Sequence, residues 1–231
     1  MLDHTVERGR ELSLLSGPAT AAAAAADAVG CDPLQRDKAK LAAADSTGLE
    51  SRHTSTYFGK RSGRQAHRYP KLWTAVHAAS HLCLSLACGS GPNPDDPKFE
   101  QLARELRQRV DSNDVEVKAL AADVGFDGER HQRMLDRLGF LGLIPPERGR
   151  PRTKSDNRRR AGFFRNFWKS QWGKIKHLYG QRWQVETYYS MFKRLLGSFL
   201  RATRRWSRHR EMCLKVITLN LMIIAHATSG R

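Results

Sequence analysis

A single carboxylate, Glu186, lies in a strongly basic part of the chain. The surrounding stretch YGQRWQVETYYSMFKRLLG begins with the phenol Tyr179 and contains three cations, Arg182, Lys193 and Arg194. Relative to Tyr179, the residues Arg182, Glu186 and Lys193 stand at i+3, i+7 and i+14. All four side chains would therefore fall within about 60° of one another on a helix. A lone acid on a cationic stripe suits a carboxylate that binds a metal while the cations hold phosphates.

Two other acids follow short apolar runs, where predicted strands end. Asp45 stands in LAAADSTG and Asp123 in LAADVGFD. In an α/β sheet, two strand-end acids and one acid on a packing helix can converge on one point. Mg²⁺ prefers carboxylate oxygens, water and phosphate, and two ions about 4 Å apart stabilise both oxygens of an in-line phosphoryl displacement. We expect Asp45, Asp123 and Glu186 to be catalytic and to hold two Mg²⁺ ions, for which Mn²⁺ can substitute.

Hydrophobic periodicity predicts the elements that position these acids. Their order is β, β, β, α, β, α, β, followed by a helical C-terminal third. The strands are expected in 38–51, in a hairpin over 69–92 that turns near 79–81, in 114–127 and in 140–146, and the helices in 95–110 and 128–140. Gly139 should close the second helix, and an apolar helix over 209–227 should cover the sheet. This order indicates an α/β domain with a mixed sheet flanked by helices.

The motifs resemble those of DDE transposases from bacterial insertion sequences. YGQRWQVETYYSMFK matches the Y-(2)-R-(3)-E-(6)-K signature of that family, ADVGFD matches its D-x-G-[YF] motif, ADSTGL resembles its D-S-T-G segment, and LIPPERGRP resembles its strand and basic loop. The resemblance runs from about Lys40 to the C-terminus. It implies a ribonuclease-H-like core in which the two aspartates and the glutamate bind metal. It also implies that Tyr179, Arg182 and Lys193 contact transposon-end DNA, the two cations mainly through phosphate, and Arg194 is expected to join them.

The implied activity is metal-dependent cleavage at transposon ends, followed by transfer of the freed 3′-hydroxyl into target DNA. The partners would be double-stranded DNA, both ends and target, and a second copy of the chain, because synapsis joins two ends. We expect residues 39–231 to form the catalytic domain. Only 44 residues precede Asp45, so the Ala-rich segment 1–38 is expected to be a shortened end-binding region, and the 62 residues between Asp123 and Glu186 leave no room for an insertion domain.

Charge favours a nucleic-acid partner. The chain has 40 Lys and Arg against 23 Asp and Glu, a net charge of +17 and a pI near 10.3, a balance that suits a polyanion. The basic residues cluster in 146–176, where the run RGRPRTK is expected to contact DNA and the aromatics of 163–172 to pack on the core, and in 193–210, a turn between two helices. Three alternatives remain: a basic protein without a specific partner, a non-catalytic DNA-binding remnant, and a ribonuclease-H-like nuclease without strand transfer.

Other polar residues near the motifs have simpler explanations. Asp127 is expected to cap the helix that follows it rather than bind metal. His77 and His81 straddle a predicted hairpin turn, which argues against a shared zinc site. Ser46 and Thr47 have no accompanying His pattern, so turn chemistry or a hydrogen bond is expected of them rather than nucleophilic catalysis.

The remaining features indicate a cytoplasmic, nucleoid-associated protein. The N-terminus carries acids and no apolar run of the kind that forms a signal peptide. The longest apolar stretch, VITLNLMIIAHA, is shorter than a bilayer span and contains Asn220, so no membrane partner is expected. No pair of cysteines forms a C-x-x-C motif, which fits reduced thiols; the cysteines are Cys31, Cys83, Cys88 and Cys213.

Overall fold

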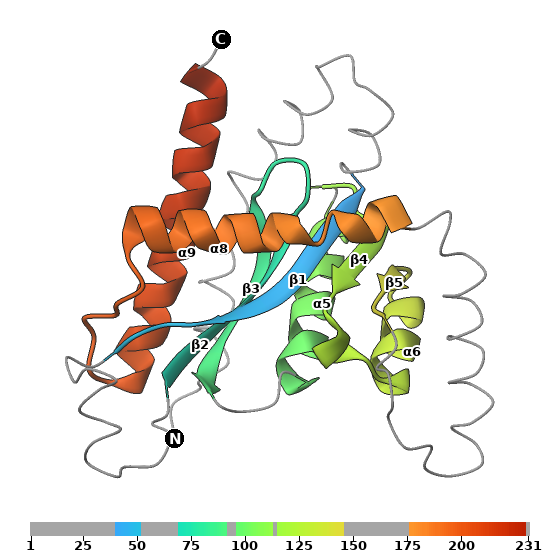
Figure 1. Ribbon diagram of the computed structural model, residues 1–231, viewed down its shortest axis with the longest axis horizontal. Helices are drawn as coiled ribbons and strands as arrows, with labels where there is room; N and C mark the ends of the chain where they lie inside the picture. Colours follow the sequence, from blue (N-terminus) through green and yellow to red (C-terminus); the bar gives the residue numbers. More distant parts are fainter. Residues whose placement is uncertain (1–39, 52–68, 92–95, 113–114, 146–175, 230–231) are drawn as a thin grey trace.

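The computed structural model describes residues 40–51, 69–91, 96–112, 115–145 and 176–229 (Figure 1). The predicted N-terminal segment 1–38 and the basic run at 148–154 lie outside the described residues, as do the aromatics of 163–172. The elements are, in order, β1 (Leu41–Gly48), β2 (Tyr69–His77), β3 (Cys83–Gly91), α5 (Asp96–Asp111), β4 (Ala119–Ala122), the 3-10 turn η1 (Val124–Phe126), α6 (Glu129–Arg137), β5 (Leu141–Leu143), α8 (Trp183–Leu196) and α9 (Arg205–Ser229). This is the predicted order of strands and helices.

The five strands form one mixed sheet in the order β3-β2-β1-β4-β5. The hairpin of β2 and β3 pairs antiparallel with β1, whereas β4 and β5 continue on its other side in parallel. Strand β1 is therefore central. A parallel neighbour needs a crossover connection, and α5 with the hairpin provides it between β1 and β4.

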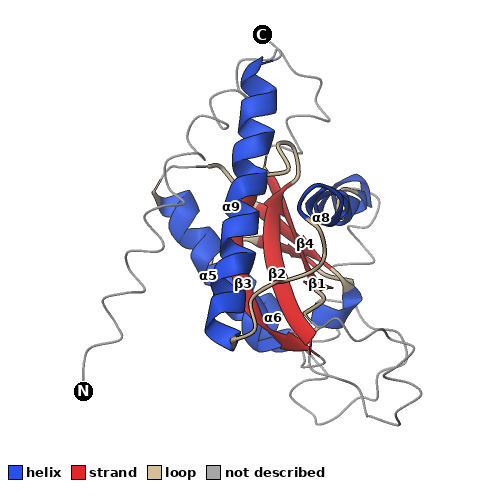
Figure 2. Cartoon of the chain, turned by 90° about the vertical axis from the view of Figure 1, so that its left-hand side faces the viewer, coloured by secondary structure: helices blue, strands red, loops and turns tan. Residues whose placement is uncertain are grey.

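Helices cover both faces of the sheet, which explains the uninterrupted apolar run at the start of β1. Helix α8 crosses one face, and α5 and α6 lie on the other (Figures 1 and 2). Ala42 and Ala44 pack in the cluster formed with α5, and Ala43 packs in the cluster formed with α8. Because successive strand residues point to opposite faces, the next odd-numbered position, Asp45, belongs to the α8 face.

The hairpin turn is tied to the start of α8. His81 has a positive φ of 58°, a conformation that His adopts more readily than most residues. Its ring nitrogen hydrogen-bonds Oε1 of Gln184, a buried residue of α8. At the other predicted turn, Gly139 has a φ of 73° and follows the end of α6, as expected of a helix-closing glycine.

Helix α9 packs along the edge strand β3. Met212, Val216 and Leu219 are buried in the α8-face cluster, and the Asn220 amide bonds both backbone groups of Cys83, accepting from its N–H at 3.0 Å and donating to its carbonyl at 2.9 Å. An edge strand exposes such groups to unwanted pairing, and this side chain satisfies one pair of them. The prediction of a sheet-covering helix is confirmed.

The expectation that this apolar segment is too short to span a bilayer does not hold for the whole helix. In the described part of the chain, α9 is one helix that is long and apolar enough to cross a membrane by length and composition. In this structure its buried residues and Asn220 instead attach it to the sheet.

Replacing Asn220 with Ala should lower the free energy of unfolding by about 2 kcal/mol, because a backbone N–H and a carbonyl of β3 lose their partner. Urea denaturation measures the change. Thr218→Ala is the matched control on the same helix: its exposed hydroxyl bonds only the Leu214 carbonyl, so its effect should stay within about 0.5 kcal/mol. Equal effects of the two substitutions would show that Asn220 does not anchor α9.

Candidate active site

Two aspartates stand at equivalent positions of adjacent parallel strands. The register pairs Ala44 of β1 with Ala122 of β4, and Asp45 and Asp123 are the next residues along each strand. The expectation that Asp45 ends its strand was wrong, because β1 continues to Gly48 paired with β2. What ends at Ala122 is the parallel pairing, and both aspartates follow that point.

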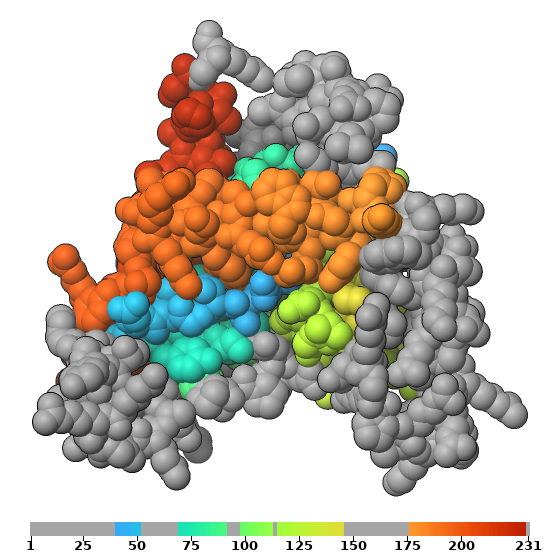
Figure 3. All heavy atoms as spheres, viewed as in Figure 1, coloured from blue at the N-terminus to red at the C-terminus, as the bar shows by residue number. Residues whose placement is uncertain are grey.

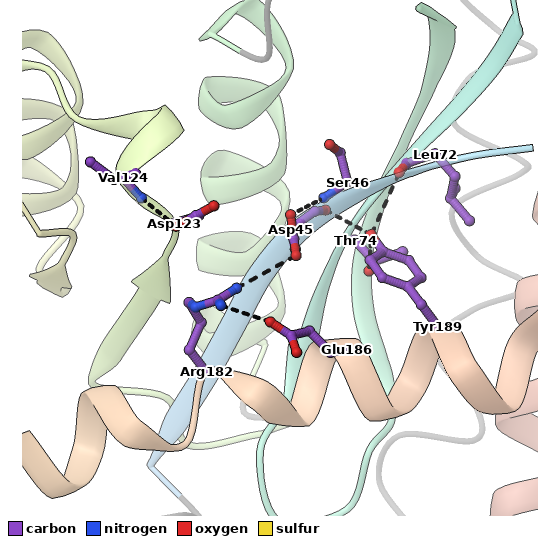
Figure 4. A network of polar contacts seen from close by, with 9 residues as sticks. All are labelled: Asp45, Ser46, Leu72, Thr74, Asp123, Val124, Arg182, Glu186 and Tyr189. Atoms are coloured by element: carbon purple, nitrogen blue, oxygen red, sulfur yellow. Dashed lines mark hydrogen bonds and ion pairs between the residues drawn. The ribbon is translucent and has the colours of Figure 1, made fainter. Parts of the chain in front are cut away.

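The third acid comes from α8, whose other face anchors the helix. Val185, Tyr188, Tyr189 and Phe192 are buried against the sheet. Glu186 lies in the first turn of α8 and is 55 % exposed. Figure 4 shows its carboxylate on the side of the helix that faces Asp45.

The predicted single helix through the signature is interrupted. Residues 176–180 are helical and 181–182 form a turn before α8. The Arg182 N–H donates to the Tyr179 carbonyl, and the Val185 N–H donates to the Arg182 carbonyl, both in the tighter i to i+3 pattern. Arg182 therefore occupies the N-cap of α8. The helical stripe predicted from the signature is interrupted at this residue, which contacts the acids.

The Arg182 guanidinium lies between two of the three carboxylates (Figure 4). Its Nη2 is 2.7 Å from Oε1 of Glu186, and its Nη1 is 3.6 Å from Oδ2 of Asp45. The Arg182 side chain is only 22 % exposed. Arg182, which is predicted to contact phosphate, forms an ion pair with Glu186 in this structure.

Neighbouring charges act on Asp45 and on the arginine. Burial raises the pKa of Asp45, and the charges of Asp123 and Glu186 add to that increase, whereas the Ser46 N–H and Arg182 oppose it. Burial disfavours the charged form of Arg182, yet Glu186, Asp123, Tyr179 and Asp45 together raise the pKa of its guanidinium. All three carboxylates are thus close enough to act on a single cation.

Backbone contacts fix the two aspartates. Asp45 Oδ1 accepts from the Ser46 N–H at 2.7 Å, and Asp123 Oδ1 accepts from the Val124 N–H at 2.7 Å. Behind Asp45, the buried Tyr189 hydroxyl donates to the Asp45 carbonyl at 2.7 Å and accepts from Oγ1 of Thr74 at 2.9 Å. Tyr189 therefore ties α8 to the strand position that carries the acid.

The donor chemistry fits a hard divalent cation, because carboxylate oxygens are the ligands that Mg²⁺ prefers. In this structure, however, Asp45 and Glu186 are paired with an arginine. Within the described ranges, no three His, Cys, Asp or Glu side chains are grouped so that they could hold a metal ion. The positive charge among the acids is the Arg182 guanidinium.

A family model described as "Transposase DDE domain" matches residues 36–221, about four-fifths of the chain. The chain belongs to this family. No curated protein matches. The five-stranded mixed sheet with its flanking helices is the α/β, ribonuclease-H-like fold that the sequence predicted. DDE transposases normally use divalent metals.

The remaining signature residues of this transposase domain lie along α8 and before it. Tyr179 is partly buried beside Arg182, and burial raises the pKa of its phenol. Lys193 and Arg194 stand exposed in the last turn of α8. They are in contact with neither aspartate and are open to a ligand along the helix.

Of the polar residues near the motifs, Asp127 does not have its predicted role as a helix cap. Gly128, not Asp127, is the N-cap of α6, and Asp127 ends η1. His77 and His81 do straddle the hairpin turn, and His77 Nδ1 bonds the Ser80 hydroxyl. Ser46 and Thr47 continue β1 rather than forming a turn.

Sequence reasoning missed the residues that support the transposase site from behind. Thr74 and Tyr189 are far from Asp45 in sequence. The register of β1 with β2 brings Thr74 opposite Asp45, and the packing of α8 on the sheet brings Tyr189. A signal existed for Tyr189, because it stands three residues after Glu186 and next to another tyrosine in an otherwise apolar helix face. A buried phenol of this kind normally has a hydrogen-bond partner.

Tyr189→Phe should destabilise the domain by about 1–2 kcal/mol, because the Thr74 hydroxyl and the Asp45 carbonyl lose a buried partner. Thermal or urea unfolding measures the change. Tyr188→Phe is the matched control, since this neighbouring buried hydroxyl lies beside the Cys83 thiol, a weak hydrogen-bonding group. Its loss should be nearly neutral, and similar losses in both variants would rule out a special role for Tyr189.

Proposed function

We propose that this chain is a transposase that cleaves phosphodiester bonds at transposon ends and joins the freed 3′-hydroxyl to target DNA. The observation that carries the proposal is the pairing of Asp45 and Glu186 with Arg182, beside Asp123 at the equivalent position of the adjacent parallel strand. Residues 39–231 would be the catalytic domain of the Y-R-E-K branch, and 1–38 a separate N-terminal segment.

Asp45, Asp123 and Glu186 are the proposed holders of two Mg²⁺ ions, for which Mn²⁺ can substitute. When bound, such ions activate water and stabilise charge on the attacking and leaving oxygens. The chain's own contribution is positional. Tyr189 and the β1–β2 register fix Asp45, the Val124 N–H orients Asp123, and the anchored face of α8 directs Glu186. No covalent protein intermediate is needed for this chemistry.

The exposed basic residues beyond the site form a surface suited to a DNA backbone. Helix α8 crosses one face of the molecule, with β1 visible beneath it (Figure 3). Lys193 and Arg194 lie in the last turn of that helix, and further exposed arginines lie in the connection to α9 (Arg201 and Arg204) and at the start of α9 (Arg205 and Arg210). Trp206 is 59 % exposed, and the Arg210 guanidinium lies 3.6 Å from its ring centroid. Arginines with an exposed aromatic ring can bind phosphates and stack on bases.

The partners proposed are double-stranded DNA, both transposon ends and target, and a second copy of this chain, because synapsis joins two ends. The attachment of α9 to β3 supports placing the protein in the cytoplasm, associated with the nucleoid, without a membrane partner.

The decisive experiment incubates the protein with linear DNA that carries the element's own ends, with Mg²⁺ or with a chelator. Cleavage followed by joining in Mg²⁺ is the expected result. Cleavage without joining would indicate a nuclease, and binding without either reaction would indicate a DNA-binding remnant.

Glu186→Gln should reduce cleavage at least about 100-fold, since an amide is a poor ligand for Mg²⁺ and several kcal/mol of transition-state stabilisation would be lost. DNA affinity should stay the same or rise, because a negative charge near phosphate has gone. Gel assays of cleavage and equilibrium binding measure the two effects. Glu116→Gln is the control: this exposed acid pairs only with Lys118, and its removal should leave cleavage unchanged. Activity of Glu186→Gln within about tenfold of the wild type would make Glu186 structural.

Lys193→Ala should lower the magnitude of the slope of log affinity against log salt by about one unit, because one phosphate contact disappears. Lys193 lies seven residues from Glu186, or about 10 Å along α8, which corresponds to about three nucleotide steps. A DNA in which the phosphate three steps from the cleaved bond is neutralised should therefore bind the wild type more weakly than unmodified DNA does. For Lys193→Ala, this loss of affinity should be smaller. Lys118→Ala, which removes a cation paired with Glu116, should leave the slope unchanged. An unaltered slope in Lys193→Ala would remove Lys193 from the DNA-binding surface.

A further inference from the structure

The Arg182 guanidinium lies between the carboxylates of Asp45 and Glu186 (Figure 4). It contacts Asp45 Oδ2 and Glu186 Oε1 directly. These are atoms of two of the three carboxylates proposed to hold divalent ions. A guanidinium cannot lose its proton in a protein, so it can leave these oxygens only by moving. A divalent cation and Arg182 therefore compete for the same two carboxylates.

Arg182 is placed where such a movement is small. It stands at the turn between the helical residues 176–180 and α8, rather than inside a regular helix. Its two carboxylate partners lie on different elements, β1 and α8. Rotation of the side chain alone would break both contacts while leaving the sheet and the buried face of α8 in place.

A released guanidinium needs another anion. Arginine binds phosphate with a bidentate fork as readily as it binds a carboxylate. Within the proposed transposase function, the anion nearest to the acids is the phosphate about to be cleaved or one beside it. The same side chain can thus serve two states, one without metal and one with metal and DNA.

We propose that Arg182 is a positioning residue that exchanges its carboxylate partners, Asp45 and Glu186, for a DNA phosphate when divalent cations bind. This inference rests on the proposed function, because it takes the three acids as metal ligands. Without DNA, Arg182 weakens cation binding, because its ion pairs must be broken. With DNA, the phosphate receives the displaced guanidinium. Binding of metal and binding of DNA then strengthen each other by the same factor, as thermodynamic linkage requires.

Calorimetry of Mg²⁺ binding to the full chain without DNA tests the competition. Arg182→Gln should bind Mg²⁺ about fivefold or more tightly than the wild type. Lys193→Gln is the matched control, because it removes a cation about 10 Å along the same helix and should change Mg²⁺ affinity by only about twofold through space. Equal or weaker Mg²⁺ binding by Arg182→Gln would overturn the proposal and leave Arg182 as scaffold.

A second measurement tests the exchange itself. The affinity for a transposon-end duplex that ends in a 3′-dideoxynucleotide, and therefore cannot be joined, is measured with and without Mg²⁺. The ratio of the two affinities should be at least about threefold smaller in Arg182→Gln than in the wild type. In Lys193→Gln both affinities should fall and their ratio should stay the same. An unchanged ratio in Arg182→Gln would refute the exchange.

Arg182→Lys provides an independent variant if the Gln variant does not fold, as judged by circular dichroism. It keeps the charge but loses the planar fork, so its affinity ratio should also fall, while its Mg²⁺ affinity should lie between those of the wild type and Arg182→Gln. Wild-type behaviour of Arg182→Lys in both measurements would contradict the proposal. These binding measurements do not require catalysis, so they decide the role of Arg182 even if the wild type fails to cleave or join DNA.

Discussion

The structure depends on holding the buried carboxylate of Asp45 near two further acids, Asp123 and Glu186. Burial raises the pKa of Asp45, and Asp123 and Glu186 raise it further. A folded chain holds such a cluster only if other contacts fix the backbone and if a cation offsets the charge. The backbone is fixed by the sheet register, by the anchored face of α8 and by Tyr189. In this structure, the cation that offsets the negative charge is Arg182.

The apolar packing follows from the same requirement. Alanines on both sides of β1 and β4 let helices approach both faces closely, so the sheet is buried where the aspartates emerge. Helix α8 presents Val185, Tyr188, Tyr189 and Phe192 to the sheet and keeps Glu186 on a different side. Helix α9 completes the α8-face cluster and covers β3. The alanines that precede the two aspartates are therefore fully buried, whereas Glu186, at 55 % exposure, is open to an incoming ligand.

Strand and helix order could be predicted because periodicity and turn residues report local structure, as the hairpin at 79–81 and Gly139 illustrate. The acids could be singled out because each follows or interrupts an apolar pattern. The long-range pairings could not. Nothing local indicates that β1 continues past Asp45, that Thr74 lies opposite it, or that Tyr189 reaches its carbonyl. Helical spacing placed Arg182 on the face of Glu186 but could not reveal the break at 181–182 or the ion pairs that form there.

The charge distribution bears on the order in which DNA and a divalent cation would bind. The chain carries a net charge of +17, so DNA is attracted to the molecule as a whole. At the acids the local field is opposite, and a phosphate cannot approach three carboxylates unless positive charge stands between them. Arg182 supplies one unit, and its contacts with Asp45 and Glu186 leave less of that charge for a phosphate. A divalent cation supplies more charge at the same place. Within the proposed function, the basic surface would hold DNA without metal, and a phosphate would come close to the acids only when a divalent cation is added there.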